Sequence, residues 1–131
     1  MSASRPQITR VLIVESVPEL ANVWQRHLLR QGMKVTSVAG QDLAIAHLSE
    51  NDTDIIILDL VIEEGCALAI SDYANYRQPD ARVIFVTNTS FFSDGSIFAH
   101  SANARAFVQS STPPEDLVAM VAHYGAELQV S

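Results

Sequence analysis

The sequence predicts an α/β domain built on a doubly wound, five-stranded parallel sheet. Five short runs of strand length are rich in β-branched or aromatic residues: 11–14, 35–39, 55–58, 83–86 and 106–108. The runs are largely apolar throughout instead of alternating with polar residues, which is typical of strands covered on both faces. Helical patterns lie between them, so right-handed crossovers would place helices on both faces of the sheet.

Five helices are expected to follow the five strands. The helical patterns occupy residues 18–31, 41–49, 67–77, 95–102 and a C-terminal stretch that ends near Leu128. In the first pattern, Trp24 and Leu28 fall on one apolar stripe, and Gly32 follows as a stop signal. Trp24 and, in the last pattern, Tyr124 are expected to pack in the core instead of binding a ligand.

Two segments match the capping box, in which two side chains three positions apart bond the free N–H groups at a helix N-terminus. They are Ser16–Glu19 and Thr112–Glu115, each with proline in the first turn. They predict that helices begin directly after the first and fifth strands.

The composition predicts one domain from a reducing compartment. With 131 residues, the chain can bury a hydrophobic core without stabilising disulfides or metal ions. Its single cysteine, Cys66, rules out an internal disulfide. A net charge of −7, with Lys34 as the only lysine, argues against nucleic-acid binding, which needs a cationic face. No apolar run approaches the length of a membrane span, and no leader is evident. We therefore expect a cytoplasmic protein without nucleic-acid or membrane partners.

Polar residues follow the carboxyl ends of the predicted strands. They are Glu15 after the first strand, Asp59 after the third, Thr87 after the fourth, and Gln109 and Ser110 after the fifth. In an open parallel sheet, ligands bind outside this edge at the point where the strand order reverses, which strands one and three would flank. Asp59 is therefore expected on the rim of a polar crevice.

This arrangement resembles the receiver domain of two-component response regulators, over about residues 10–128. The resemblance implies a flavodoxin-like receiver fold with strand order 2-1-3-4-5. Residues 1–9 would form a tail, and we expect no output domain because only residues 129–131 follow the last helical pattern. In that family a strand-three aspartate accepts a phosphoryl group, and DIIILDL places the acceptor at Asp59. By the same resemblance, VIFVT places the switch hydroxyl at Thr87, and ARAFVQS places the switch aromatic at Phe107.

The chain departs from the family pattern where Mg²⁺ and a lysine are expected. The family holds Mg²⁺ with an acidic pair after strand one, and this chain has Glu15 followed by Ser16. Because a neutral hydroxyl is a poor ligand for a hard dication, the resemblance implies only a weak Mg²⁺ site on Glu15 and Asp59. Ser110, or Gln109 if the register slips by one, stands in place of the strand-five lysine.

The loop after the acceptor also differs. The family usually has a proline four residues after the aspartate and a glycine eight after, whereas this chain has Glu63 and Gly65. Glu63 and Glu64 would either form a solvated turn or, in the case of Glu63, supply the carboxylate that Ser16 lacks.

Two functions of different classes follow. One is a working but impaired receiver, whose enzymatic activity would be limited to Mg²⁺-dependent autophosphorylation and autodephosphorylation at Asp59. The other is a phosphorylation-independent pseudo-receiver that acts as a protein-interaction module. Nucleotide-binding loops and metal-ligand spacings of histidine are missing from the sequence.

The resemblance also implies the partners. A sensor histidine kinase or a phosphotransfer protein would supply the phosphoryl group, and a downstream protein would receive the signal. The pair Phe91 and Phe92 follows Thr87 in the sequence. If one of the two is exposed, we expect it to anchor the downstream partner or a second copy in a homodimer.

Overall fold

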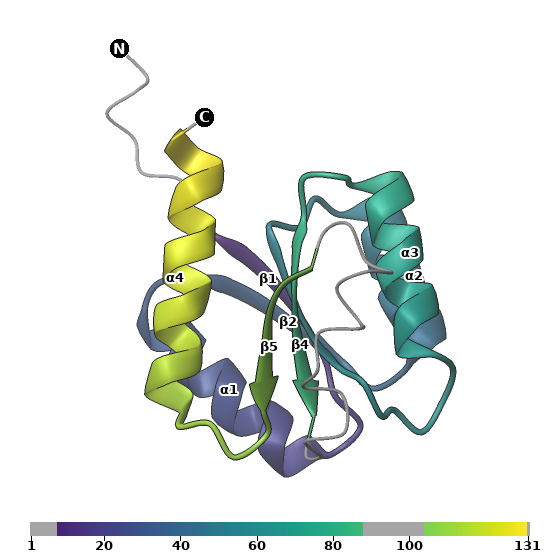
Figure 1. Ribbon diagram of the computed structural model, residues 1–131, viewed down its shortest axis with the longest axis horizontal. Helices are drawn as coiled ribbons and strands as arrows, with labels where there is room; N and C mark the ends of the chain where they lie inside the picture. Colours follow the sequence, from purple (N-terminus) through teal and green to yellow (C-terminus); the bar gives the residue numbers. More distant parts are fainter. Residues whose placement is uncertain (1–7, 88–103, 131) are drawn as a thin grey trace.

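The computed structural model describes residues 8–87 and 104–130 of the chain, and within them five strands and four helices alternate (Figure 1). Their bounds are β1 Arg10–Val14, α1 Pro18–Arg30, β2 Lys34–Val38, α2 Gln41–Glu50, β3 Ile55–Asp59, α3 Ala67–Arg77, β4 Arg82–Thr87, β5 Ala104–Gln109 and α4 Pro114–Val130. The five predicted strands are confirmed. The helix expected at 95–102 and the pair Phe91 and Phe92 lie outside the described residues.

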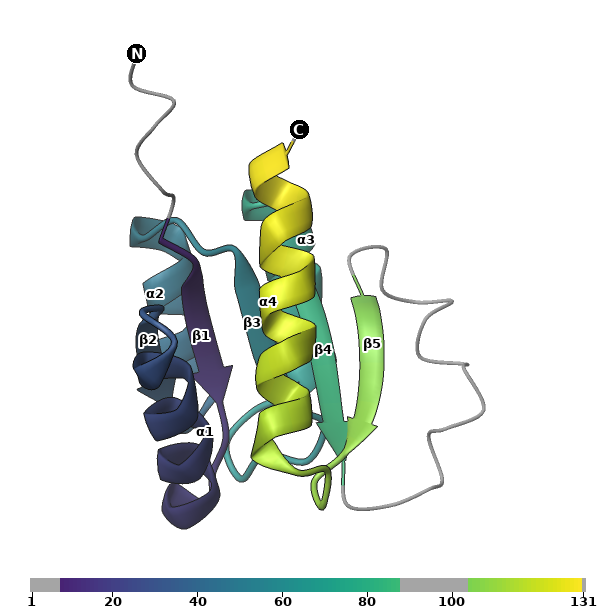
Figure 2. The same cartoon turned by 90° about the vertical axis from the view of Figure 1, so that its left-hand side faces the viewer.

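The sheet is parallel throughout, with the strand order β2-β1-β3-β4-β5. This is the predicted doubly wound order, in which β1 and β3 lie side by side at the point of reversal. Helices α1 and α4 cover one face, and α2 and α3 cover the other (Figures 1 and 2). All five strands therefore end at the same edge of the sheet.

Alternate residues of each central strand enter two separate cores. In β3, Ile56 and Leu58 pack against α2 and α3, whereas Ile55 and Ile57 pack against α1 and α4. This explains why the central runs are apolar at every position. Trp24 is 2% exposed in the second core, which confirms its expected role.

The end of α1 follows the sequence signal. The N–H groups of Gln31 and Gly32 donate to the carbonyl oxygens of Leu28 and Leu29, and Gly32 takes the left-handed conformation at φ +82°. Glycine adopts this conformation without the steric cost that other residues carry, so it ends the helix where predicted.

The predicted capping box at Ser16 is wrong. Helix α1 begins at Pro18, its N-cap residue is Val17, and no side chain caps it. The Ser16 hydroxyl instead donates to Ala39 O and accepts the Glu63 N–H, so tertiary contacts outweigh the local pattern. At the other predicted box, α4 begins at Pro114, two residues after Thr112. None of the helices in the described ranges is long and apolar enough to cross a membrane.

Candidate functional site

The strand register brings Glu15 and Asp59 together. Val14 is paired with Leu58 across β1 and β3, so the next residue of each strand emerges at the same edge of the sheet. The two carboxyl groups lie close enough for Asp59 to shift the pKa of Glu15. Glu15 is only 3% exposed, whereas Asp59 is half-buried. The sequence-based expectation that these two acids converge is met.

Two ionised carboxylates side by side repel each other, so Glu15 and Asp59 need a proton or a cation between them. Burial and, next, the interaction of protonated Glu15 with the Asp59 carboxylate raise the pKa of Glu15 from its ordinary 4.5 to about 8. The Val17 N–H, which donates to Glu15 Oε2 at 3.1 Å, opposes this shift only in part. The other oxygen, Oε1, is buried and accepts no N–H donor.

The Asp59 carboxylate is oriented by its own loop. Its Oδ1 accepts the Val61 N–H at 2.8 Å, and the intervening Leu60 N–H donates to Val86 O at 2.9 Å. These bonds fix the first turn after β3 against β4. The acid therefore sits at the rim of the sheet, and its side chain reaches solvent.

The other aspartate of the DIIILD run has a different environment. Asp54 lies just before β3, and its carboxylate accepts hydrogen bonds from the backbone N–H and the guanidinium of Arg10. This pairing closes the opposite end of the sheet. The two aspartates thus bracket a buried strand, one in a structural ion pair and one at the candidate site.

Thr87 and Ser110 lie next to each other where β4 and β5 end. Thr87 is fully buried, and Ser110 N–H donates to its carbonyl oxygen at 2.6 Å. In the β4–β5 register, Thr87 pairs with Gln109, so Ser110 is the first residue beyond the strand. Phe107 is half-buried and packs against the core that faces α2 and α3.

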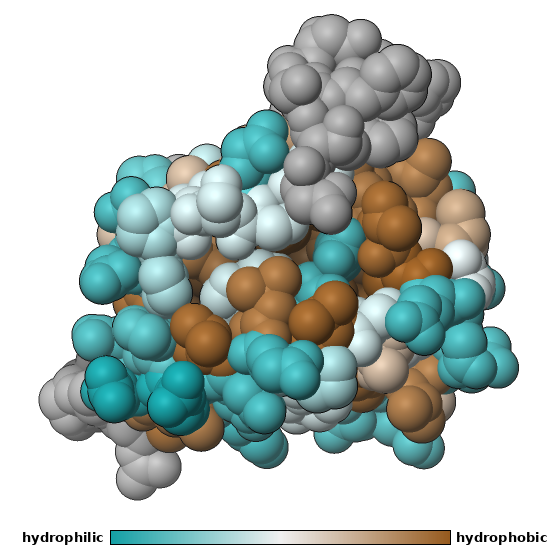
Figure 3. All heavy atoms as spheres, turned by 90° about the horizontal axis from the view of Figure 1, so that it is seen from below, coloured by the Kyte–Doolittle hydropathy of each residue, from teal (hydrophilic) through white to brown (hydrophobic). Residues whose placement is uncertain are grey.

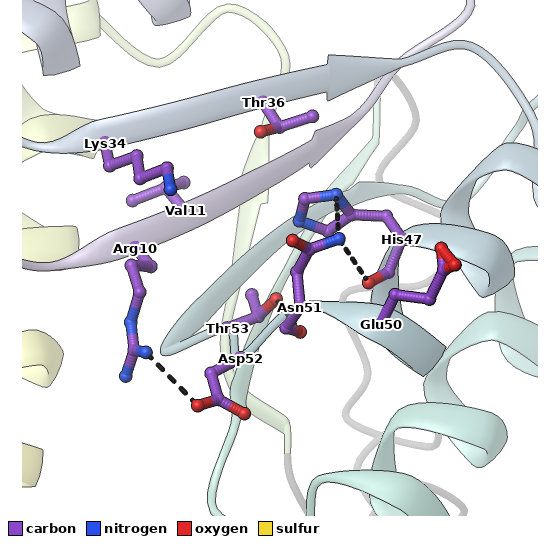
Figure 4. Close-up of a pocket in the computed structure, with 9 residues that line it drawn as sticks. All are labelled: Arg10, Val11, Lys34, Thr36, His47, Glu50, Asn51, Asp52 and Thr53. Atoms are coloured by element: carbon purple, nitrogen blue, oxygen red, sulfur yellow. Dashed lines mark hydrogen bonds and ion pairs between the residues drawn. The ribbon is translucent and has the colours of Figure 1, made fainter.

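The only lysine stands at the opposite end of the sheet. Lys34 begins β2, is paired in register with Arg10, and lines a cavity of about 190 Å³ with His47 and seven other residues (Figure 4). Strand β2 runs away from that cavity toward the edge where Glu15 and Asp59 meet. Lys34 therefore cannot supply a cation to the candidate site.

The described residues offer no third carboxylate at the Glu15–Asp59 pair. Glu63 and Glu64 have exposed side chains, and Asp59 is the only acid that shifts the pKa of Glu15. The described part of the chain contains no group of three histidine, cysteine, aspartate or glutamate side chains that could hold a metal ion. The solvated-turn interpretation of Glu63 and Glu64 agrees with this exposure.

Apolar patches lie on this end of the molecule. Figure 3 views the end toward which β4 and β5 point, and brown apolar patches interrupt the teal polar surface. Val17 and Val61, each two residues after one of the paired acids, are 48% and 62% exposed. The paired acids are thus followed in the chain by exposed apolar side chains.

One residue that holds the β3–α3 loop was not predicted from the sequence. Gln41, at the start of α2, donates its backbone N–H to Glu64 O and accepts the Cys66 N–H on its side chain. A glutamine in this position has no sequence signal of its own. Only the glycines at 40 and 65 hint that two backbone segments approach each other closely.

Comparison with known proteins agrees with this geometry. The sequence model of the response regulator receiver domain matches residues 11–122, which is most of the chain. The chain belongs to the response regulator receiver domain family. Receiver domains act in two-component signalling, where they interact with histidine kinases or phosphotransfer proteins.

Among curated relatives of this receiver domain is the response regulator SaeR of Staphylococcus aureus (strain USA300). It is 29% identical over 111 residues, which cover 85% of this chain and 48% of SaeR. The receiver domain described here therefore spans about half the length of that relative.

Solved structures share the receiver fold. The signal receiver domain of a putative Luxo repressor protein from Vibrio parahaemolyticus has a TM-score of 0.84 at 21% identity, and the match covers 95% of both chains. The response regulator TrrA from Thermotoga maritima, solved in complex with Mg(2+)-BeF, has a TM-score of 0.78 at 18% identity. That match covers 89% of this chain and 99% of TrrA. At such identities the likeness shows the fold alone.

Proposed function

We propose that this receiver domain accepts a phosphoryl group on Asp59, slowly, from the phosphohistidine of a kinase or phosphotransfer protein. The contact between the Glu15 and Asp59 carboxyl groups at the switch point carries the proposal. A carboxylate oxygen of Asp59 attacks the phosphorus, the bond from phosphorus to the donor histidine breaks, and the imidazole leaves with the electron pair. The product is an aspartyl phosphate. Its later hydrolysis restores the Asp59 carboxylate.

The residues present fit a Mg²⁺ ion, although weakly. Mg²⁺ is commonly bound through one or two carboxylates and completes its shell with water and phosphate oxygens. Glu15 and Asp59 would hold it, and the buried Glu15 Oε1, which accepts no N–H, is an oxygen suited to a cation. When bound, the ion would neutralise negative charge on the transferred group. Binding requires Glu15 to release its proton.

Three further residues complete the proposed site. The Thr87 hydroxyl would contact a phosphoryl oxygen, and Phe107 would change rotamer when Asp59 is modified. Ser110 stands in place of the lysine and brings a hydroxyl where the family has a charge. If the missing charge contacts cost about 2–4 kcal/mol, transfer slows roughly 10²–10³-fold relative to a complete site.

The alternative function is a pseudo-receiver that binds partners without phosphorylation. Two observations favour it: the raised pKa of Glu15, which leaves that carboxyl mostly protonated at neutral pH, and the position of Lys34 at the far end of the sheet. In that case the exposed apolar surface at the site end would serve binding alone.

Phosphorylation with a small phosphodonor tests the proposal. Incubation with phosphoramidate and Mg²⁺, followed by intact mass spectrometry, should add one phosphoryl group over minutes to hours. Asp59→Asn and chelation of Mg²⁺ should each abolish the adduct. Asp54→Asn is the matched control, because it changes the aspartate at the other end of β3 and should leave the adduct intact. No adduct on the unmodified chain would overturn the proposal in favour of the pseudo-receiver.

A further inference from the structure

The turns that follow β1, β2 and β3 are tied to one another beside Asp59. Ser16 Oγ donates to Ala39 O at 3.4 Å and accepts the Glu63 N–H at 2.9 Å, which connects the first turn to the other two. Gln41 connects the second turn to the third. The loop between β3 and α3 is therefore held from two sides.

We call Gln41 and its two partners, Glu64 and Cys66, the Gln41 clasp. The Gln41 backbone N–H donates to Glu64 O at 3.0 Å, and its Oε1 accepts the Cys66 N–H at 2.7 Å. Cys66 is the N-cap residue of α3, and its own side chain makes no capping hydrogen bond. In a capping box, an acid or amide three residues later bonds this N–H, and here that residue is Ala69. Gln41 performs the task from another helix.

Two glycines let the clasp close. Gly65 has a left-handed backbone at φ +96°, and a Cβ there would overlap the Gln41 side chain. A Cβ at Gly40 would lie 3.1 Å from the Glu64 Cβ, which is tighter than ordinary packing. Both turns thus depend on the absence of a side chain at the point of approach.

The clasp is connected to the acceptor through a short segment. Only a few residues separate Asp59 from Glu64, the first clasp residue in this loop. Within them, the Val61 N–H donates to Asp59 Oδ1 at 2.8 Å. The chain lacks the family proline that would stiffen this loop at position 63. Hydrogen bonds from neighbouring turns therefore carry the restraint that proline would otherwise supply.

We propose that Gln41 is a positioning residue for Asp59: by clamping the far end of the β3–α3 loop, it keeps the Val61 N–H bond and so the orientation of the acceptor carboxylate. The positioning role rests on the proposed function at Asp59. Gln41 hydrogen-bonds Glu64 and Cys66, so it would act on the acceptor only through the loop.

Amide hydrogen exchange tests the structural half of the proposal without any phosphorylation. In Gln41→Ala, protection should fall at both Cys66 and Val61, although the Val61 N–H donates to Asp59 and not to Gln41. Gln41→Glu keeps an oxygen that can accept the Cys66 N–H and should restore protection at both sites. Gln31→Ala, at an exposed glutamine on the end of α1, is the control and should change neither. Loss of protection at Cys66 alone would overturn the positioning role.

Affinity for beryllofluoride with Mg²⁺, followed by NMR, tests the functional half. Loss of one hydrogen bond should weaken binding about five-fold in Gln41→Ala, and Gln41→Glu should recover it. A lower melting temperature with unchanged affinity would indicate a merely structural residue and would overturn the proposal.

Failure of the proposed function at Asp59 can be distinguished from failure of the positioning role of Gln41. If the unmodified chain binds no beryllofluoride, the proposed function at Asp59 fails, while the exchange data still decide whether the clasp restrains Val61. If Gln41→Ala does not fold, Gln41→Asn replaces it, because the shorter side chain stays polar but cannot reach the Cys66 N–H. Unchanged protection in a folded Gln41→Asn would overturn the clasp.

Discussion

The Glu15 carboxyl couples folding to pH. Its pKa of about 8 in the folded chain exceeds the ordinary value of 4.5, because burial and the Asp59 carboxyl disfavour the charged form. Between these pH values the folded chain keeps a proton that the unfolded chain has released. The free energy of unfolding of the metal-free protein should therefore fall as pH rises from about 4.5 to 8.

Glu15→Gln should remove this pH dependence, since the amide is neutral at every pH. In the presence of EDTA, the substitution should raise the free energy of unfolding at pH 8 by roughly 1–3 kcal/mol and change it little at pH 4.5. Urea unfolding at the two pH values measures both effects. Glu19→Gln, an exposed acid in the first turn of α1, is the control. A stability gain that is equal at both pH values would contradict the prediction.

Ser16 stands where the family has the second acid of its metal-binding pair, and it connects two loops instead. Its hydroxyl donates to Ala39 O and accepts the Glu63 N–H. These bonds use the Ser16 side chain to join the loops. Ser16→Asp should add a carboxylate beside the paired acids and tighten Mg²⁺ binding about ten-fold or more, as measured by NMR titration. Ser16→Ala should loosen the loop and leave Mg²⁺ affinity within about two-fold. Equal affinities in the two variants would argue that residue 16 does not face the metal position.

At the scale of the elements, β3 could be predicted from the sequence and the start of α1 could not. Burial on both faces leaves an apolar run between two charged ends, and this pattern is visible in residues 54–59. At α1, Ser16 matches a cap, yet Glu15 takes the Val17 N–H and Ser16 bonds Glu63, which lies 47 residues away. A local pattern carries no information about such distant partners.

The same distinction applies to the candidate site. The approach of Glu15 to Asp59 followed from parallel strand order, because the strands end at one edge. The burial of Glu15 and the Gln41 clasp did not follow, because both depend on how three loops pack onto one another. Sequence patterns thus indicated which acids meet but not the environment that sets their protonation.

The N-terminal end of β3 offers a prediction about stability alone. Asp54 is 18% exposed and accepts three hydrogen bonds from Arg10, one of them from its backbone N–H. Asp54→Ala would leave these donors without their acceptor, so we expect a loss of about 1–3 kcal/mol in the free energy of unfolding. Phosphorylation at Asp59 should persist in the folded protein. Denaturant unfolding measures the loss, with Asp52→Ala, at the exposed partner of Arg10, as the milder control.

Across the whole molecule, the sheet separates two charged regions. The Arg10–Asp54 pair and the cavity that contains Lys34 lie where β1 and β2 begin, and the Glu15–Asp59 pair lies where β1 and β3 end. Ile55, Ile56, Ile57 and Leu58 fill the space between them with no exposed surface. A strand of five residues spans roughly 16 Å at about 3.3 Å per residue, so direct contact between the two regions is excluded.

This separation predicts that changes at the two ends act independently. The effects of Asp54→Ala and Glu15→Gln on the free energy of unfolding should add in the double variant to within about 0.5 kcal/mol, because neither side chain shares a partner with the other. The measurement is a double-mutant cycle by urea unfolding at pH 8 in EDTA. Glu15→Gln combined with Asp59→Asn should instead depart from additivity, since the Asp59 carboxyl shifts the pKa of Glu15. Coupling of similar size in both cycles would mean that the buried strand transmits a rearrangement from one end of the sheet to the other.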